Sequence, residues 1–129
     1  MGATRDVALT ELPLRGISIN DATDGSTTVA VVASDSGVLF VNQQAGETTY
    51  TLPTVALGKG KWFWFFNQGA AGMVITSDTE DMIVGVNGVV YDTLSLTTGS
   101  ARIGASALFF CDGTNYFAIA MSGTAVYAT

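Results

Sequence analysis

The sequence predicts an all-β protein, folded as a single β-sandwich or jelly-roll-like barrel with an extended N-terminal arm. Short β-branched and aromatic runs recur along the chain, and turn residues separate them. The 15 glycines punctuate the chain from end to end. In addition, no window of ten or more residues keeps the apolar spacing of a helix.

The N-terminal stretch differs from the rest of the chain. It holds no sustained period of two or of 3.6 residues, and a long polar run closes it. We therefore expect an extended arm over residues 1–28 and a β-sandwich domain over 29–129. Two alternatives stand for the arm: it lies against another protein surface, or it adds an edge strand to its own domain. Strand-like contacts are expected from the alternating residues Leu12, Leu14, Ile17 and Ile19.

The first expected strands follow the arm directly. Residues 28–33 are β-branched and apolar, and 37–41 read Gly-Val-Leu-Phe-Val. Residues 48–52 alternate and end at a proline. The aromatic run 61–66 comes next, and 73–76 follows a Gly-Ala-Ala-Gly break.

Two turn signals organise the second half of the chain. Asn87-Gly88 is the strongest short hairpin signal, and it joins two short apolar runs. Asp112-Gly113-Thr114-Asn115 is a second hairpin loop. The strands expected here are 82–86, 89–91, 94–96, 101–103, 107–111, 116–121 and a final edge strand at 125–127.

The run 61–66 is aromatic on both faces of its expected strand. Alternation sends Trp62, Trp64 and Phe66 to one face, and Phe63 and Phe65 to the other. One face should meet the opposite sheet and the other a sister subunit or another protein; which is which stays open. The residues expected at an interface with a subunit or another protein are Trp62, Phe63, Trp64, Phe65, Leu12, Leu14, Ile17 and Ile19.

Composition narrows the class of partner. The 129 residues are 48% hydrophobic and only 12% charged, so polar surface is scarce. The net charge of -6 and the scattered cations argue against nucleic acid as a partner. We expect no membrane partner, because no apolar run reaches the length of a span. The single cysteine excludes an intrachain disulfide and suits a reducing cytosol.

Catalytic groups are scarce, and we expect neither an enzyme nor a cofactor. The chain has no histidine, so Cys111 and the serines lack the usual activating base. We expect Cys111 to be a buried structural thiol. Calcium-binding loops are an alternative to plain solvated acidic loops at two places, around Asp78, Glu80 and Asp81 and around Asp21 and Asp24.

The aromatic residues allow one further alternative, a stacking platform for sugars. Trp62, Trp64 or Tyr116 on an open face would serve for it. Core or subunit interface is the favoured interpretation, because apolar patches of that size are rare on free monomers.

The order of the motifs resembles a known family. Tyr-Thr-Leu-Pro at 50–53 precedes a Gly-rich turn, an aromatic strand ends in Asn67, and a Gly-led strand starts at Gly72. An isoleucine, Ile83, follows, and the stretch closes with the Cys-Asp-Gly-Thr-Asn-Tyr hairpin. Over roughly residues 38–120 this is similar to the small β-domain of bacteriophage virion proteins, among them tail-fibre segments and head decoration (cement) proteins. The resemblance implies no catalytic residues and implies assembly as a homotrimer.

These observations together give the expected function. We expect a non-enzymatic capsid decoration protein of a tailed bacteriophage, made in the host cytoplasm and placed on the outer surface of the capsid. Its expected partners are the major capsid protein and further copies of itself. The alternative is a tail- or head-fibre module that binds host-surface glycans; a free-standing lectin-like domain ranks third and an enzyme last.

Overall fold

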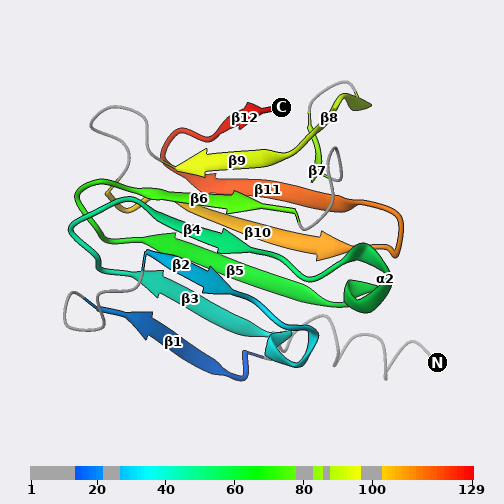
Figure 1. The fold of residues 1–129 in the computed structure, drawn as a ribbon, viewed down its shortest axis with the longest axis horizontal. Helices are drawn as coiled ribbons and strands as arrows, with labels where there is room; N and C mark the ends of the chain where they lie inside the picture. The colour runs from blue at the N-terminus through cyan, green and yellow to red at the C-terminus, as the bar shows by residue number, and fades with distance from the viewer. Residues whose placement is uncertain (1–13, 22–26, 78–82, 86–87, 97–102) are drawn as a thin grey trace, which may run out of the picture.

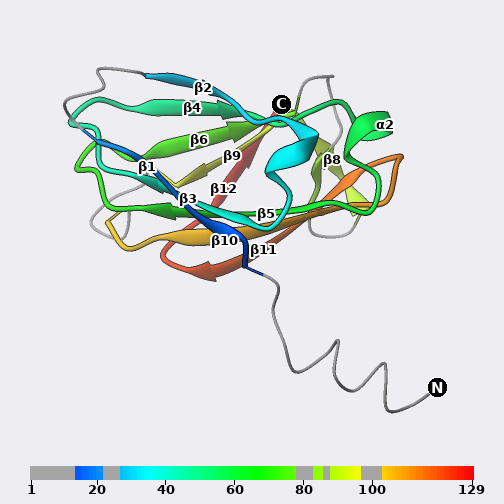
Figure 2. The ribbon, with the colours of Figure 1, turned by 90° about the horizontal axis from the view of Figure 1, so that it is seen from below.

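The chain folds into two β-sheets packed face to face, which confirms the all-β sandwich (Figures 1 and 2). The computed structural model describes residues 14–21, 27–77, 83–85, 88–96 and 103–129. The seven-stranded sheet has the order β1 (Gly16–Asn20), β3 (Val38–Asn42), β5 (Trp62–Asn67), β10 (Ser106–Cys111), β11 (Tyr116–Ser122), β7 (Ile83–Val84), β8 (Val90–Tyr91). The five-stranded sheet has the order β12 (Val126–Ala128), β9 (Thr93–Leu96), β6 (Met73–Thr76), β4 (Thr48–Thr51), β2 (Thr28–Ala30).

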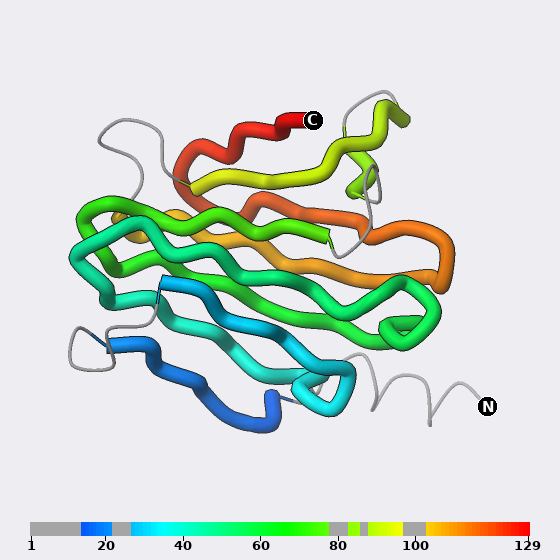
Figure 3. Tube along the Cα trace, viewed as in Figure 1, coloured from blue at the N-terminus to red at the C-terminus, as the bar shows by residue number. Residues whose placement is uncertain are grey.

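The first six strands form a parallel coil. The chain alternates between the two sheets, so β1, β3 and β5 stack in one sheet and β2, β4 and β6 in the other (Figure 3). Two parallel neighbours in one sheet need a crossover connection between them, and here that connection contains a strand of the other sheet. Asn42 lies opposite Asn67, and Thr48 opposite Met73, so both sheets repeat every 25 residues at this turn. These parallel pairs rule out the antiparallel jelly-roll alternative.

Buried asparagines line the interior at the end of this coil. Asn20, Asn42 and Asn67 are register partners on neighbouring strands, and the last two have no exposed surface. The side chain of Asn42 donates to Asn67 Oδ1 at 3.1 Å and to the carbonyl of Gly72 at 3.2 Å. Gln44 Nε2 donates to Asn20 Oδ1 at 2.9 Å. Stacked amides of this kind hold neighbouring turns in register, because a slip would leave buried polar groups unpaired.

Both expected hairpins are confirmed in the second half of the chain. Strands β7 and β8 pair antiparallel around Gly88, whose φ is 74°. In the β10–β11 hairpin, Asp112 Oδ1 accepts hydrogen bonds from the amides of Thr114 and Asn115, both at 2.8 Å. These bonds lower the pKa of the Asp112 carboxyl, the bond from Asn115 most. Asn87, the first residue of the expected Asn87-Gly88 turn, lies outside the described residues, as does residue 86.

The core between the sheets contains a cluster of aromatic rings. Phe40 stacks on Phe65 with ring centroids 5.4 Å apart, and Phe109 meets Phe65 edge to face at 5.5 Å. Tyr50, from the five-stranded sheet, closes the cluster against Phe40 and Phe65. Rings in such offset and edge-to-face pairs stabilise beyond the area they bury.

The observed elements differ from expectation at three places. Residues 16–20, which were expected within the arm, form strand β1, which pairs with β3 along five residues. Of the two alternatives for the arm, the edge strand therefore holds for this part, while residues 1–13 lie outside the described residues. A strand at 101–103 is not supported at its described residue, since Ile103 lies in a turn. Two short helical turns, η1 (Ala33–Asp35) and α2 (Val55–Gly58), were not expected.

Candidate functional site: an uncharged face of the seven-stranded sheet

The described residues hold little that could do chemistry. Among them, no group of three or more Cys, Asp or Glu side chains could hold a metal ion. Of the acidic residues named for the calcium-binding alternative, Asp78, Glu80, Asp81 and Asp24 lie outside the described residues. No helix in the described ranges is long and apolar enough to cross a membrane.

Cys111 is buried, as expected for a structural thiol. Its Sγ donates to the carbonyl of Val55 in α2 at 3.4 Å, and burial is the main cause that raises the pKa of the thiol. Next to it, the Tyr116 hydroxyl donates to the carbonyl of Pro53 at 2.5 Å. Tyr116 has no exposed surface, so it cannot be part of a sugar-stacking platform. Both side chains hold the segment around α2 against the β10–β11 hairpin.

The structure shows which face of β5 is buried in the core and which points outward. Phe63 and Phe65 are 0% exposed and lie in the core. Trp62, Trp64 and Phe66 lie on the opposite face, pointing away from the second sheet, and are half-buried. The assignment of Phe63 and Phe65 to an interface is therefore corrected: they have no surface left to offer a partner, because the chain's own second sheet covers them.

The tryptophans belong to a larger apolar surface, which we call the outer face. Strand register places outward-pointing side chains side by side across β1, β3, β5, β10 and β11. This is the lower surface of the lower sheet in Figure 2. The outer face consists of Ile17, Ile19, Leu39, Val41, Trp62, Trp64, Phe66, Leu108, Phe110, Phe117 and Ile119.

Exposure on the outer face is highest at its two sides. Ile17 and Ile19 on edge strand β1 are 58% and 53% exposed. On the far side, Ile119 is 53% exposed and Phe117 41%. The central strand β5 is shielded by its neighbours, and there the Nε1 atom of Trp64 is buried with no hydrogen-bond partner among the described residues. Of the other expected interface residues, Leu14 is exposed beside β1, and Leu12 lies outside the described residues.

The five described strands that form this surface carry no charged side chain, because none of them contains Asp, Glu, Lys or Arg. At one end, the face is bordered by neutral polar pairs: Gln43 donates to Gln68 at 2.8 Å, and the Ser106 and Ser122 hydroxyls lie 2.8 Å apart. An apolar centre with a polar rim is the usual anatomy of a protein–protein interface.

The area of the outer face can be estimated from the strand geometry and compared with apolar patches on other proteins. Five strands spaced about 4.8 Å apart, each contributing about five residues of 3.3 Å, make a face of roughly 400 Å². Contiguous apolar patches on typical monomers reach about 300–600 Å², and the largest are often functional. At about 25 cal/mol per Å², covering the face is worth on the order of 10 kcal/mol before the costs of association.

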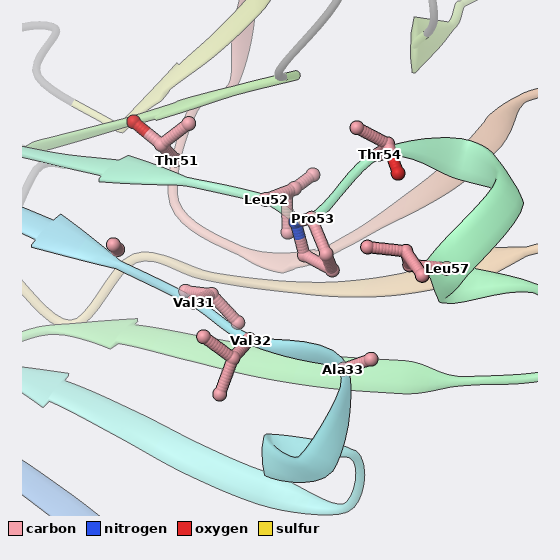
Figure 4. A pocket seen from close by; sticks show the side chains of 9 residues that line it. Val31, Val32, Ala33, Thr51, Leu52, Pro53, Thr54 and Leu57 are labelled. Atoms are coloured by element: carbon pink, nitrogen blue, oxygen red, sulfur yellow. The ribbon is translucent and has the colours of Figure 1, made fainter.

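A second apolar feature lies at the opposite side of the sandwich. A hollow of about 250 Å³ opens between the end of β2, the end of β4 and α2 (Figure 4). Val31, Val32, Leu52, Pro53 and Leu57 contribute most of its wall. Its lining includes no ionisable side chain, so it offers shape but no chemistry.

Several members of the outer face escaped the sequence analysis. Leu39, Val41, Leu108, Phe110 and Ile119 lie in strands that were expected, but only the aromatic run was recognised as two-faced. One signal in the sequence could have identified them: every second residue in each of these strands is uncharged and points to the same face. What was missing was the strand order, which places those positions side by side.

Comparison with known proteins adds no family: no protein-family model matches the chain, nor does any curated protein or solved structure. The fold and the outer face define a β-sandwich protein with a large uncharged surface suited to contact with protein.

Proposed function

We propose that this protein is a non-enzymatic structural protein of a tailed bacteriophage virion, a capsid decoration (cement) protein that stabilises the head. The observation that carries the proposal is the outer face, which has no charged side chain on any of its five strands. Apolar patches of this size are often functional, and contact with another protein is a common role for them. The resemblance of the closing hairpin to phage virion β-domains supplies the biological setting.

The proposed mechanism is mechanical. The partners are the major capsid protein and further copies of the chain, with the trimer that the resemblance implies as the expected unit. Each copy buries apolar surface across a joint between capsid subunits. A closed shell repeats the same joint many times through its symmetry, so a modest gain per copy adds up against internal pressure.

A fibre module that binds host glycans is the second candidate. The observation that favours it is the position of Trp62 and Trp64 on an outward face rather than in the core. A sugar ring can stack on such side chains. Against this stands the lack of charged side chains on the five strands, because sugar sites combine aromatic rings with several placed polar groups.

A reconstitution experiment tests the proposal. Heads lacking the protein are mixed with the purified full chain, and release of DNA is followed during heating. The proposal predicts saturable binding and a higher release temperature. Heads that bind none of it contradict the proposal, and saturable Trp62-dependent binding on a glycan array would favour the fibre module.

A further inference from the structure

The middle row of the outer face is symmetric in its residue types about the central strand. Register pairs Ile17 with Leu39, Leu39 with Trp64, Trp64 with Leu108, and Leu108 with Ile119. Across β1, β3, β5, β10 and β11, the middle row therefore reads Ile-Leu-Trp-Leu-Ile. This row has the same order in either direction, with Trp64 at its centre.

This middle row complements itself under a two-fold axis. In an isologous interface the same patch serves both subunits, so each residue type must meet an acceptable partner after rotation by half a turn. A two-fold axis through β5 places Ile17 of one copy over Ile119 of the other, and Leu39 over Leu108. Two such faces can stack as sheets do in a sandwich, about 10 Å apart.

Charge favours a second copy over a foreign partner. The chain carries a net charge of -6, so contacts between copies are repulsive wherever carboxylates meet. The described acidic residues lie in turns and loops outside the five strands, at Asp21, Asp35, Glu47, Asp92 and Asp112. The outer face is thus a surface on which two copies meet without opposing like charges. It also offers no carboxylate to a basic partner.

We propose that the outer face packs against the outer face of a second copy of this chain, related by a two-fold axis near Trp64. The inference rests on the proposed function, because it names the self-contact of that assembly. Any three-fold contact then uses other surfaces. The face supplies roughly 400 Å² per copy, about half of a standard interface, so the pair should dissociate measurably on dilution.

The two tryptophans make the inference directly measurable. Trp62 and Trp64 are the only tryptophans in the chain, and both lie on the outer face. Tryptophan emission and its quenching by acrylamide therefore report whether the face is covered. Sedimentation equilibrium of the full chain over a dilution series gives the stoichiometry in parallel.

The test uses three variants chosen for exposure, so that folding is preserved. Ile119→Lys and, as a second site, Ile17→Lys put a charge on the face at residues that are 53% and 58% exposed. Leu57→Lys is the matched control, since Leu57 is 66% exposed but lies on α2, away from the face. Circular dichroism checks that all three remain folded.

The wild-type chain should form dimers, or hexamers if trimers pair, and dilution should shift tryptophan emission to the red. Both face variants should associate at least about 100-fold more weakly, because an unpaired charge is then buried at the contact. Leu57→Lys should match the wild type. Monomers or trimers as the largest wild-type species, or face variants that pair normally, would overturn the inference. If the chain decorates heads but never pairs with itself, the pairing inference is overturned and the proposed function stands. If the chain pairs but does not bind heads, the proposed function is overturned and the pairing inference stands.

Discussion

Asn42 donates a hydrogen bond from its side-chain amide to Oδ1 of Asn67 across 3.1 Å, inside the protein, where neither residue has exposed surface. The two residues lie directly opposite each other on parallel strands β3 and β5. Each follows an outer-face residue, Val41 or Phe66. The buried amide pair thus fixes the register that places the apolar side chains outward, since a slip by one residue would reverse the faces of a strand.

Removing the central amide should destabilise the fold. In Asn42→Ala, Asn67 and the Gly72 carbonyl lose a donor, and the Gln44 amide loses an acceptor. We expect a loss of about 2–3 kcal/mol in the free energy of unfolding, measured by urea titration. Gln43→Ala is the control, because the Gln43 side chain is exposed and donates to Gln68 at the surface; its cost should stay below about 0.5 kcal/mol. Equal losses in the two variants would contradict a structural role for the buried amides.

Two glycines next to this amide row should respond differently to alanine. A Cβ on Gly69 would lie 2.4 Å from the backbone oxygen of Gln44 and 3.1 Å from Asn42 Nδ2. A Cβ on Gly46 would meet only Thr27 Cγ2, at 3.9 Å. Neither glycine has a positive φ. Gly69→Ala should therefore cost about 1–3 kcal/mol through overpacking, and Gly46→Ala should be neutral or slightly stabilising in thermal melts. A Gly69→Ala protein that melts with the wild type would show that the turn adapts.

The Tyr116 hydroxyl should contribute measurably to stability. Tyr116→Phe keeps the buried ring but removes the donor that reaches the Pro53 carbonyl at 2.5 Å. We expect a loss of about 1–2 kcal/mol in urea unfolding. Tyr127→Phe, at a half-buried ring on β12, serves as the comparison and should cost less. If the two substitutions have equal effects, the bond between the hairpin and the α2 segment is unimportant.

Stability should fall in strongly alkaline solution because of Tyr50. Burial raises the pKa of this phenol from 10.0 to about 12. A raised pKa means that the folded state holds the proton more tightly than the unfolded state. The resulting stabilisation is complete below pH 10 and is lost as the pH rises toward 12. Urea midpoints measured across this interval should decline more steeply for the wild type than for Tyr50→Phe. Parallel declines would contradict the assignment to Tyr50.

The sequence predicted the strands well and their arrangement poorly. Alternation and turn residues located β5, β6 and the β10–β11 hairpin within a residue or two, because both are local signals. The parallel coil depends on pairs 25 residues apart, such as Asn42 with Asn67, which local patterns do not reveal. The Asn-Gln dipeptides at 42–43 and 67–68 did carry that spacing.

The outer face was predicted at its centre and at Ile17 and Ile19 on its β1 side, but not in between or beyond. The prediction that β5 has two apolar faces was correct. The sequence could not show which face points into the core, because both faces are aromatic. The opposite sheet decides it, by covering Phe63 and Phe65. The remaining members of the face, such as Leu108 beside Trp64, become neighbours only through the order of the strands.

The number of copies in purified virions tests the central claim most directly. Quantitative mass spectrometry against labelled peptides of this chain gives that number relative to the major capsid protein. A protein that braces the shell should be present in on the order of hundreds of copies, because a closed symmetric shell repeats each binding site. A dozen or so copies would place the chain in the tail or a fibre, and its absence from virions would contradict the account as a whole.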